Sequence, residues 1–187
     1  MFNDRYGLTQ AVIKGRKTMT RRIMNNQYGN LAGCVGFTKN GRARTYVRAD
    51  FDNGISEDAT YAVDEVVAVA QSYNSFYDDT YNPVLFPAGA GWGNKMFVKA
   101  ELMPHQIRIT GIKYERLQDI SEEDCMREGI IYRESQNPIE CGYTFHGSKH
   151  SYGSPRAAFA SLIDKVSGRG TWKRNPWVVV YEFELVK

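Results

Sequence analysis

The stretch Gly15-Arg16-Lys17-Thr18-Met19-Thr20-Arg21-Arg22-Ile23 decides how the fold of this chain is interpreted. It places four cations and two hydroxyls directly after a short helical pattern, and no carboxylate within it neutralises them. The helical pattern runs from Tyr6 to Lys14, and Gly15 follows it as a helix terminator. The stretch therefore predicts a site for an anionic or polar ligand, although cations are also favourable at a helix end.

Length and composition predict one soluble domain. The 187 residues suffice for one hydrophobic core, so we expect a single domain over 1–187. Hydrophobic residues make up 42% and charged residues 24%, which excludes a disordered or membranous composition. No apolar run approaches the roughly 18 residues that span a bilayer, and the first residues lack a signal-peptide core. We expect a cytoplasmic protein with no membrane partner.

A net charge of +3 is only mildly basic, so an argument for nucleic-acid binding depends on where the charge lies. The cysteines Cys34, Cys125 and Cys141 are widely spaced and predict free thiols. Cys141, His146 and His150 are suitable zinc ligands, but a structural zinc site almost always needs a fourth. We therefore expect no metal and no cofactor.

The periodicity predicts about six strands and three short helices without regular alternation. This pattern favours an α+β domain built on a curved or closed mixed sheet. Besides the first helix, one helix is expected from Ser121 to Gly129, with Asp124 completing a capping box, and another from Ser154 to Gly168. Strands are expected at 63–72, 96–101, 106–114 and 177–185.

Three irregular segments, near 24–60, 73–92 and 131–153, are interpreted as insertions into a smaller domain. The first contains a hairpin signal at Asn40-Gly41. The second is rich in aromatic residues, which either stack on bases or pack over an edge of the core. Packing is the commoner role of aromatic side chains, and the sequence leaves both roles open.

Lys17 and Thr20 are candidate catalytic residues. They would point to opposite faces of a strand, so they converge only if the backbone turns between them, whereas Thr20 and Arg22 would share a face. Neighbouring cations favour the neutral form of a lysine, which suits a base. The alternative is a solvated basic turn. Glu128 lies at the end of its helix, against the macrodipole, which indicates either a functional carboxylate or a salt bridge.

Three stretches in this order resemble the ASCH domain family, which is similar to PUA domains: 15–22, 120–129 and 176–183. The resemblance implies a PUA-like β-barrel with short flanking helices and an RNA-binding cleft. One branch, the small N4-acetylcytidine amidohydrolases, implies Thr20 as nucleophile, Lys17 as its activating base and Glu128 as proton carrier to the leaving amine. Arg22 matches an arginine of the same motif. Those enzymes are little more than half as long as this chain.

The expected ligand is RNA, a nucleotide or a modified nucleoside, with Arg16, Arg21 and Arg22 as binding residues. Three classes of function stay open: an amidohydrolase, a non-catalytic RNA-binding module, and an interaction protein with a vestigial cleft. The hydrolase requires Lys17, Thr20 and Glu128 to converge on one cavity. The binding module requires an open positive face beside exposed aromatic residues.

Overall fold

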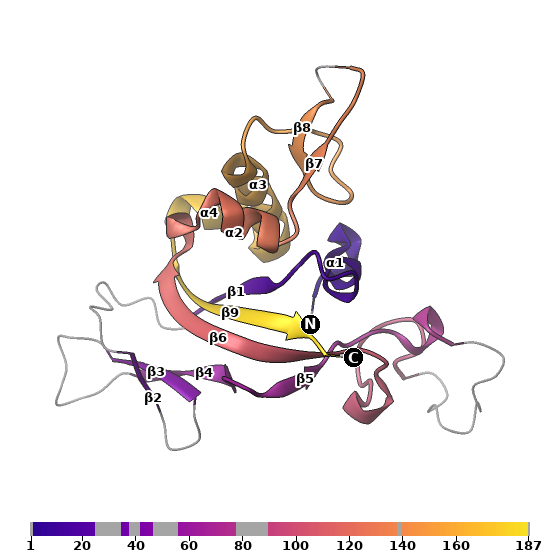
Figure 1. Cartoon of the computed structure of the whole chain (residues 1–187), viewed down its shortest axis with the longest axis vertical. Helices are drawn as coiled ribbons and strands as arrows, with labels where there is room; N and C mark the ends of the chain where they lie inside the picture. Colours follow the sequence, from indigo (N-terminus) through magenta and orange to yellow (C-terminus); the bar gives the residue numbers. More distant parts are fainter. Residues whose placement is uncertain are drawn as a thin grey trace.

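The computed structural model describes residues 2–24, 35–37, 42–46, 56–77, 90–137 and 140–186. These residues form an α+β fold with short helices and a curled antiparallel sheet (Figure 1). The strands are β1 (Met19–Ile23), β2 (Val35–Phe37), β3 (Arg42–Tyr46), β4 (Ser56–Ala62), β5 (Val66–Ala68), β6 (Gln106–Arg116), β7 (Ile131–Arg133), β8 (Gly142–Thr144) and β9 (Trp177–Leu185). The α-helices are α1 (Leu8–Ile13), α2 (Glu122–Arg127), α3 (Pro155–Ser167) and α4 (Thr171–Arg174). The 3-10 turns are η1 (Asp4–Tyr6), η2 (Tyr73–Ser75), η4 (Ala100–Leu102) and η5 (Leu117–Asp119).

The central sheet has the strand order β1-β9-β6-β5, and every pairing in it is antiparallel. The long strands β6 and β9 form its centre, and the sheet bends around them into a half-barrel (Figure 1). The β6–β9 register shifts between Ile109 and Gly111, which is an irregularity of the kind that bends and twists a strand. A mixed sheet was expected, but all pairs among the described strands are antiparallel.

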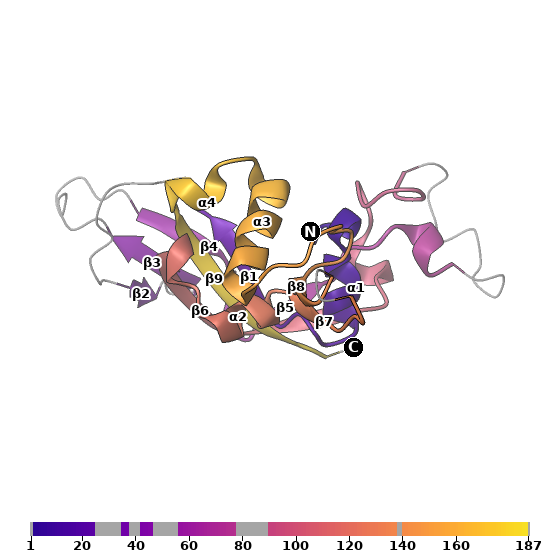
Figure 2. The same cartoon turned by 90° about the horizontal axis from the view of Figure 1, so that it is seen from above.

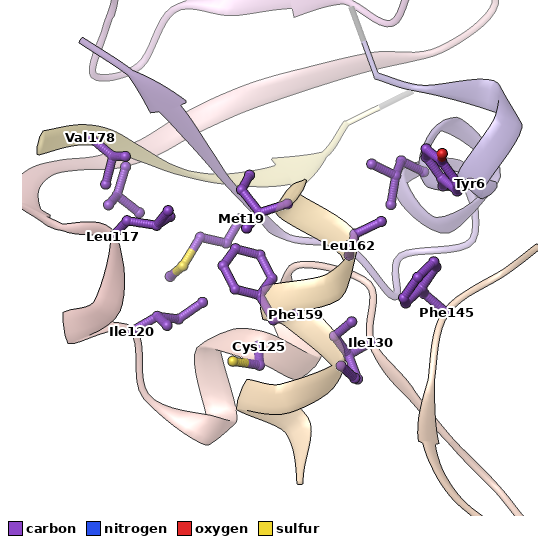
Figure 3. Packing of buried hydrophobic residues seen from close by; sticks show 14 residues of the cluster. Tyr6, Met19, Leu117, Ile120, Cys125, Ile130, Phe145, Phe159, Leu162 and Val178 are labelled. Atoms are coloured by element: carbon purple, nitrogen blue, oxygen red, sulfur yellow. The ribbon is translucent and has the colours of Figure 1, made fainter. Parts of the chain in front are cut away.

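Strand β9 is buried on both faces and separates two hydrophobic clusters. Val178 and Val180 face the helices, together with Met19 of β1 and Phe159 of α3. Figure 3 shows the Phe159 ring beside Met19, with Leu162 farther along the same helix. The alternate residues of β9, Val179, Tyr181 and Phe183, belong to the second cluster, inside the half-barrel. Figure 2 shows α3 and α4 lying across the sheet.

The caps of α2 and α3 form as predicted. The Ser121 hydroxyl accepts from the Asp124 amide at 3.0 Å, and Ser154 caps α3 with Pro155 in its first turn. The predicted capping box is incomplete, because the Asp124 carboxylate bonds to Arg21 instead of returning to Ser121. The first predicted helix is divided by Gly7, whose φ of 62° separates η1 from α1.

The predicted strand at 96–101 is wrong. This segment forms turns followed by η4, and Phe97 has a φ of 62°, which is incompatible with an extended strand. The predicted strand at 63–72 shortens to β5, which follows a turn at Asp64. The predicted strand at 106–114 forms as β6 and continues to Arg116, and the last strand, β9, has the predicted bounds.

The expected insertions contain regular structure. Strands β2 and β3 form the antiparallel pair predicted around Asn40-Gly41, which itself lies outside the described residues, and β4 extends this small sheet. The segment 131–153 contains the β7–β8 hairpin. Tyr73 is buried, and its ring packs edge-on against Phe76 at 6.2 Å. Tyr73, Phe76 and Tyr77 therefore pack in a small hydrophobic cluster that includes Met103, while 78–89 lie outside the described residues.

Candidate functional site

The backbone turns between the end of α1 and the start of β1. Gly15 has a φ of 67°, and the amide of Lys17 donates to Ala11 O at 2.9 Å, which folds the chain back on the helix. The amide of Thr18 then donates to Arg127 O at 3.0 Å and fastens the turn to α2. Strand β1 starts at Met19. Lys17 therefore precedes the strand that carries Thr20, so the alternation of side chains along β1 does not set where Lys17 points relative to Thr20.

Lys17 and Glu128 form a buried ion pair. Lys17 Nζ lies 2.5 Å from Glu128 Oε2 and donates to Glu128 O at 2.9 Å and to Met19 O at 2.7 Å. All three ammonium protons are thereby used within the protein. Lys17 is 2% exposed and Glu128 is 5% exposed. Glu128 is the C-cap residue of α2, so its placement against the macrodipole is offset by two cations, Lys17 and Arg21.

Arg21 extends this pair into a network. Its guanidinium contacts Glu128 Oε1 at 3.1 Å, Glu115 Oε1 at 2.7 Å and Asp124 Oδ2 at 2.9 Å. Lys113 of β6 also contacts two of these carboxylates: its Nζ lies 3.1 Å from Glu115 Oε2 and 3.3 Å from Asp124 Oδ2. The network joins β1, β6 and α2, and its cations and carboxylates alternate. Two of the four cations of the 15–23 segment, Lys17 and Arg21, are thus balanced by carboxylates inside the protein.

Burial controls the protonation of this network. Burial lowers the pKa of the Lys17 ammonium, and the charge and hydrogen bond of Glu128 only partly oppose this. Burial alone would raise the pKa of Asp124, but the hydrogen bond from Arg21 and the charge of Lys113 outweigh it and lower the pKa. The surroundings of Lys17 therefore shift its protonation equilibrium toward the neutral amine.

A cavity of about 390 Å³ opens beside the ion pair. Its polar wall contains Lys17, Thr20, Arg21, Arg22 and Glu128, which are five of the six residues singled out in the sequence. Its apolar wall comes from the N-terminal segment, α1 and α3: Phe2, Leu8, Phe159, Leu162, Ile163 and Val166. The sixth residue, Arg16, lines a different cavity.

A second, more apolar pocket of about 220 Å³ lies against the interior of the half-barrel. It shares Phe2, Thr20 and Arg22 with the first cavity, so these side chains lie where the two meet. Thr20 and Arg22 share this face of β1 because they alternate with the buried Met19 and Arg21. Aromatic rings line the pocket farther in: Tyr61, Tyr181 and Phe183.

Sequence reasoning missed two groups in the site. Glu115 and Asp124 hold Arg21, and Phe2 lies between the two cavities. The alternation of Lys113 and Glu115 at the end of a predicted strand was the available signal for the first group. Phe2 has none, because it precedes the first periodic segment. Within the described residues no three potential metal ligands come together, at Cys141, His146 and His150 or elsewhere.

No helix among the described residues has both the length and the apolar character to cross a bilayer. Comparisons with protein-family models, curated proteins and solved structures found no match to this chain.

Proposed function

We propose that the Lys17 cavity binds a nucleoside-like molecule and that the chain hydrolyses an amide on it, with N4-acylated cytidine as the substrate class. One observation carries this proposal: the contact of Lys17 and Glu128 lies in the wall of a cavity that Thr20 also lines. These three residues are the set that the resemblance to ASCH amidohydrolases implies. A PUA-like identity for the curled half-barrel belongs to the same proposal.

The charge of the site favours a small neutral ligand over an RNA strand. Lys17 and Arg21 are paired with carboxylates and are nearly inaccessible, so neither offers a full positive charge to phosphates. The cavity of about 390 Å³ is within the usual range for small-molecule sites, about 300 to 1,000 Å³. The aromatic pocket beyond Thr20 suits a planar base.

The proposed acylation step starts within the ion pair. Lys17 passes a proton to Glu128 Oε2, which leaves a neutral amine and a carboxylic acid, and burial favours the neutral form of Lys17. The amine takes the Thr20 hydroxyl proton as Oγ1 attacks the acyl carbonyl. Glu128 gives its proton to the amide nitrogen as the C–N bond breaks, and the free cytosine amine leaves. Arg22, on the same face as Thr20, stabilises the developing oxyanion.

Deacylation completes the cycle, and the ion pair is restored when Glu128 finally returns a proton to Lys17. Water attacks the ester on Thr20 and gives a proton to the Glu128 carboxylate. The Lys17 ammonium returns its proton to Thr20 Oγ1 as the ester C–O bond breaks. The carboxylic acid of the acyl group is the second product. No external oxidant, reductant or metal enters either step.

The direct test is incubation of purified protein with N4-acetylcytidine and chromatographic measurement of cytidine release. Thr20→Val and Lys17→Met should each nearly abolish turnover, because nucleophile and base act as a unit. Glu128→Gln retains the shape of the carboxylate and should lower kcat by about 10²- to 10⁴-fold. Ser167→Ala is the matched control, because Ser167 also lines the cavity with a hydroxyl but has no role in the mechanism.

Thr20→Ser separates the chemical role from a structural one, since it keeps the hydroxyl and should retain measurable turnover. Circular dichroism of every variant identifies those that fail to fold. Wild-type turnover that survives Thr20→Val would refute the nucleophile. A folded wild type with no turnover on acetyl, formyl and propionyl N4-cytidines would refute the hydrolase, and titration with single-stranded RNA would then test the non-catalytic module.

A further inference from the structure

A separate cavity of about 370 Å³ lies next to residues that adjoin the Lys17–Glu128 pair in sequence. Arg16 and Gly129 are part of its wall, and Arg133 and His146 line it from the β7–β8 hairpin and the loop that follows β8. Figure 2 shows α1 lying beside this hairpin. Arg16, Arg133 and His146 come from three separate segments. No carboxylate is among the described residues that line this cavity.

The two arginines of this cavity differ from Arg21. Arg21 contacts three carboxylates, whereas the side chains of Arg16 and Arg133 make neither an ion pair nor a hydrogen bond within the described part of the chain. Arg16 is exposed and Arg133 is half-buried. Two guanidiniums line one cavity with no carboxylate among its described lining residues, so a bound anion would be attracted to both.

Glycines with left-handed backbone shape the wall. Gly7, Gly129 and Gly147 line the cavity with φ values of 62°, 107° and 78°. A Cβ on Gly7 would lie 2.9 Å from His146 Cβ, and one on Gly147 would lie 3.1 Å from Arg5 O. The loop that carries His146 therefore packs against the η1–α1 junction more closely than a side chain at Gly7 or Gly147 would permit. This contact holds the imidazole at the cavity.

We infer that this cavity binds the phosphate group of an organic phosphate monoester, for which a mononucleotide is the probe. Guanidinium groups present paired N–H donors that match the oxygens of a phosphate, and the imidazole of His146 adds another N–H donor. The volume exceeds what inorganic phosphate needs and falls in the range of small-molecule sites. This function is separate from the amide hydrolysis proposed for the Lys17 cavity.

The test is isothermal titration calorimetry of the purified chain with cytidine 5′-monophosphate, cytidine and inorganic phosphate. The mononucleotide should bind, and Arg16→Gln and Arg133→Gln should each lower its association constant about tenfold or more. Arg16→Lys keeps the charge but loses the paired donors and should lower it less. Lys14→Gln is the matched control, because it removes one exposed cation from the same turn but does not line the cavity.

The arms of the experiment separate the alternatives. Equal binding of inorganic phosphate and the mononucleotide would overturn the assignment to an organic phosphate and leave a simple anion site. An equal loss in Lys14→Gln would show general charge attraction and overturn the site. Binding of a single-stranded RNA but not of the mononucleotide would also overturn it. Cytidine lacks the phosphate, so its binding reports only on the Lys17 cavity. The effect of the Arg16 and Arg133 substitutions on mononucleotide binding does not depend on whether the Lys17 cavity hydrolyses an amide.

Discussion

Lys17 Nζ contacts both the side chain and the main chain of Glu128, at 2.5 Å to Oε2 and 2.9 Å to O, across 111 positions of sequence. One ammonium thus neutralises the carboxylate and also satisfies a carbonyl at the C-terminal end of α2. The same group borders the proposed substrate cavity. The pair consequently stabilises the packing of α2 against β1 as well as supplying the proposed proton transfers.

Lys17→Met should destabilise the fold by about 3 to 5 kcal/mol, because it leaves the Glu128 carboxylate buried with one partner fewer. Urea unfolding followed by fluorescence measures the change. In a double-mutant cycle with Glu128→Gln, the double variant should lose much less than the sum of the single losses. Additive losses would show that the two side chains do not stabilise each other.

Arg21→Met should destabilise the fold by at least about 3 kcal/mol, because three partly or fully buried carboxylates lose a cation. Arg16→Met removes an exposed cation of the same segment and should change the free energy of unfolding by about 0.5 kcal/mol or less. The comparison uses the same urea experiment at constant pH. Similar losses in both variants would indicate that the network adds little to stability.

The pH dependence of stability should reflect Asp124. Its pKa is lowered from the ordinary value of 3.8, so its contribution is fully present above that value and is lost as the pH falls through the folded pKa. The difference in unfolding free energy between wild type and Asp124→Asn should therefore be constant near neutral pH and shrink in acid. Glu122→Gln, an exposed change on the same helix, is the control. The same acid-dependent shrinkage in Glu122→Gln would show that the Asp124 pairs are not the cause.

Local patterns predicted the elements that depend on local chemistry. Strand β9 alternates large apolar residues over its whole length, so its bounds could be read from period two. The Ser121 cap likewise needs only a hydroxyl and an amide three residues later. The segment 96–101 was predicted wrongly because a strand also needs a neighbouring strand to pair with, which local alternation does not reveal. Phe97 instead adopts a left-handed turn, with 78% of its surface exposed.

The site was predictable in its residue types and less so in its pairing. The carboxylate of Glu128 at the end of α2 and the cation-rich turn each indicated binding to groups of opposite charge. A salt bridge was one of the two interpretations of Glu128. The contacts of Arg21 with Glu115 and Asp124 join elements about a hundred positions apart. Such pairings depend on the register of β1, β9 and β6, which no local pattern contains.

Cys125 should be inert to thiol reagents in the folded chain. Burial raises its pKa to about 12, so the thiol stays protonated at neutral pH and is inaccessible. Cys141 is half-buried and should react with an aromatic disulfide reagent at pH 8 before Cys125 does. Peptide mass spectrometry after short labelling identifies the modified residue, and labelling in urea should include Cys125. Labelling of Cys125 before Cys141 under native conditions would contradict its burial.

Gly7 and Gly15 allow the cost of a left-handed backbone to be separated from the cost of a close contact. Their φ values, 62° and 67°, are nearly equal, so Ala at either position should lose roughly 1 to 2 kcal/mol from the backbone alone. No atom lies within 4 Å of a Cβ built on Gly15, whereas a Cβ on Gly7 would lie 2.9 Å from His146 Cβ. Gly7→Ala should therefore destabilise the fold more than Gly15→Ala.

The excess loss in Gly7→Ala measures how firmly the His146 loop is held against α1, and urea unfolding of the two variants gives it directly. The same displacement should move His146 away from Arg16 and weaken binding of cytidine 5′-monophosphate in Gly7→Ala. Gly15→Ala keeps the loop in place and should bind the mononucleotide like the wild type. Equal losses of unfolding free energy in the two variants would mean that the His146 loop moves away from Gly7 without an energetic cost. The close contact at Gly7 would then not be what holds His146 at the cavity.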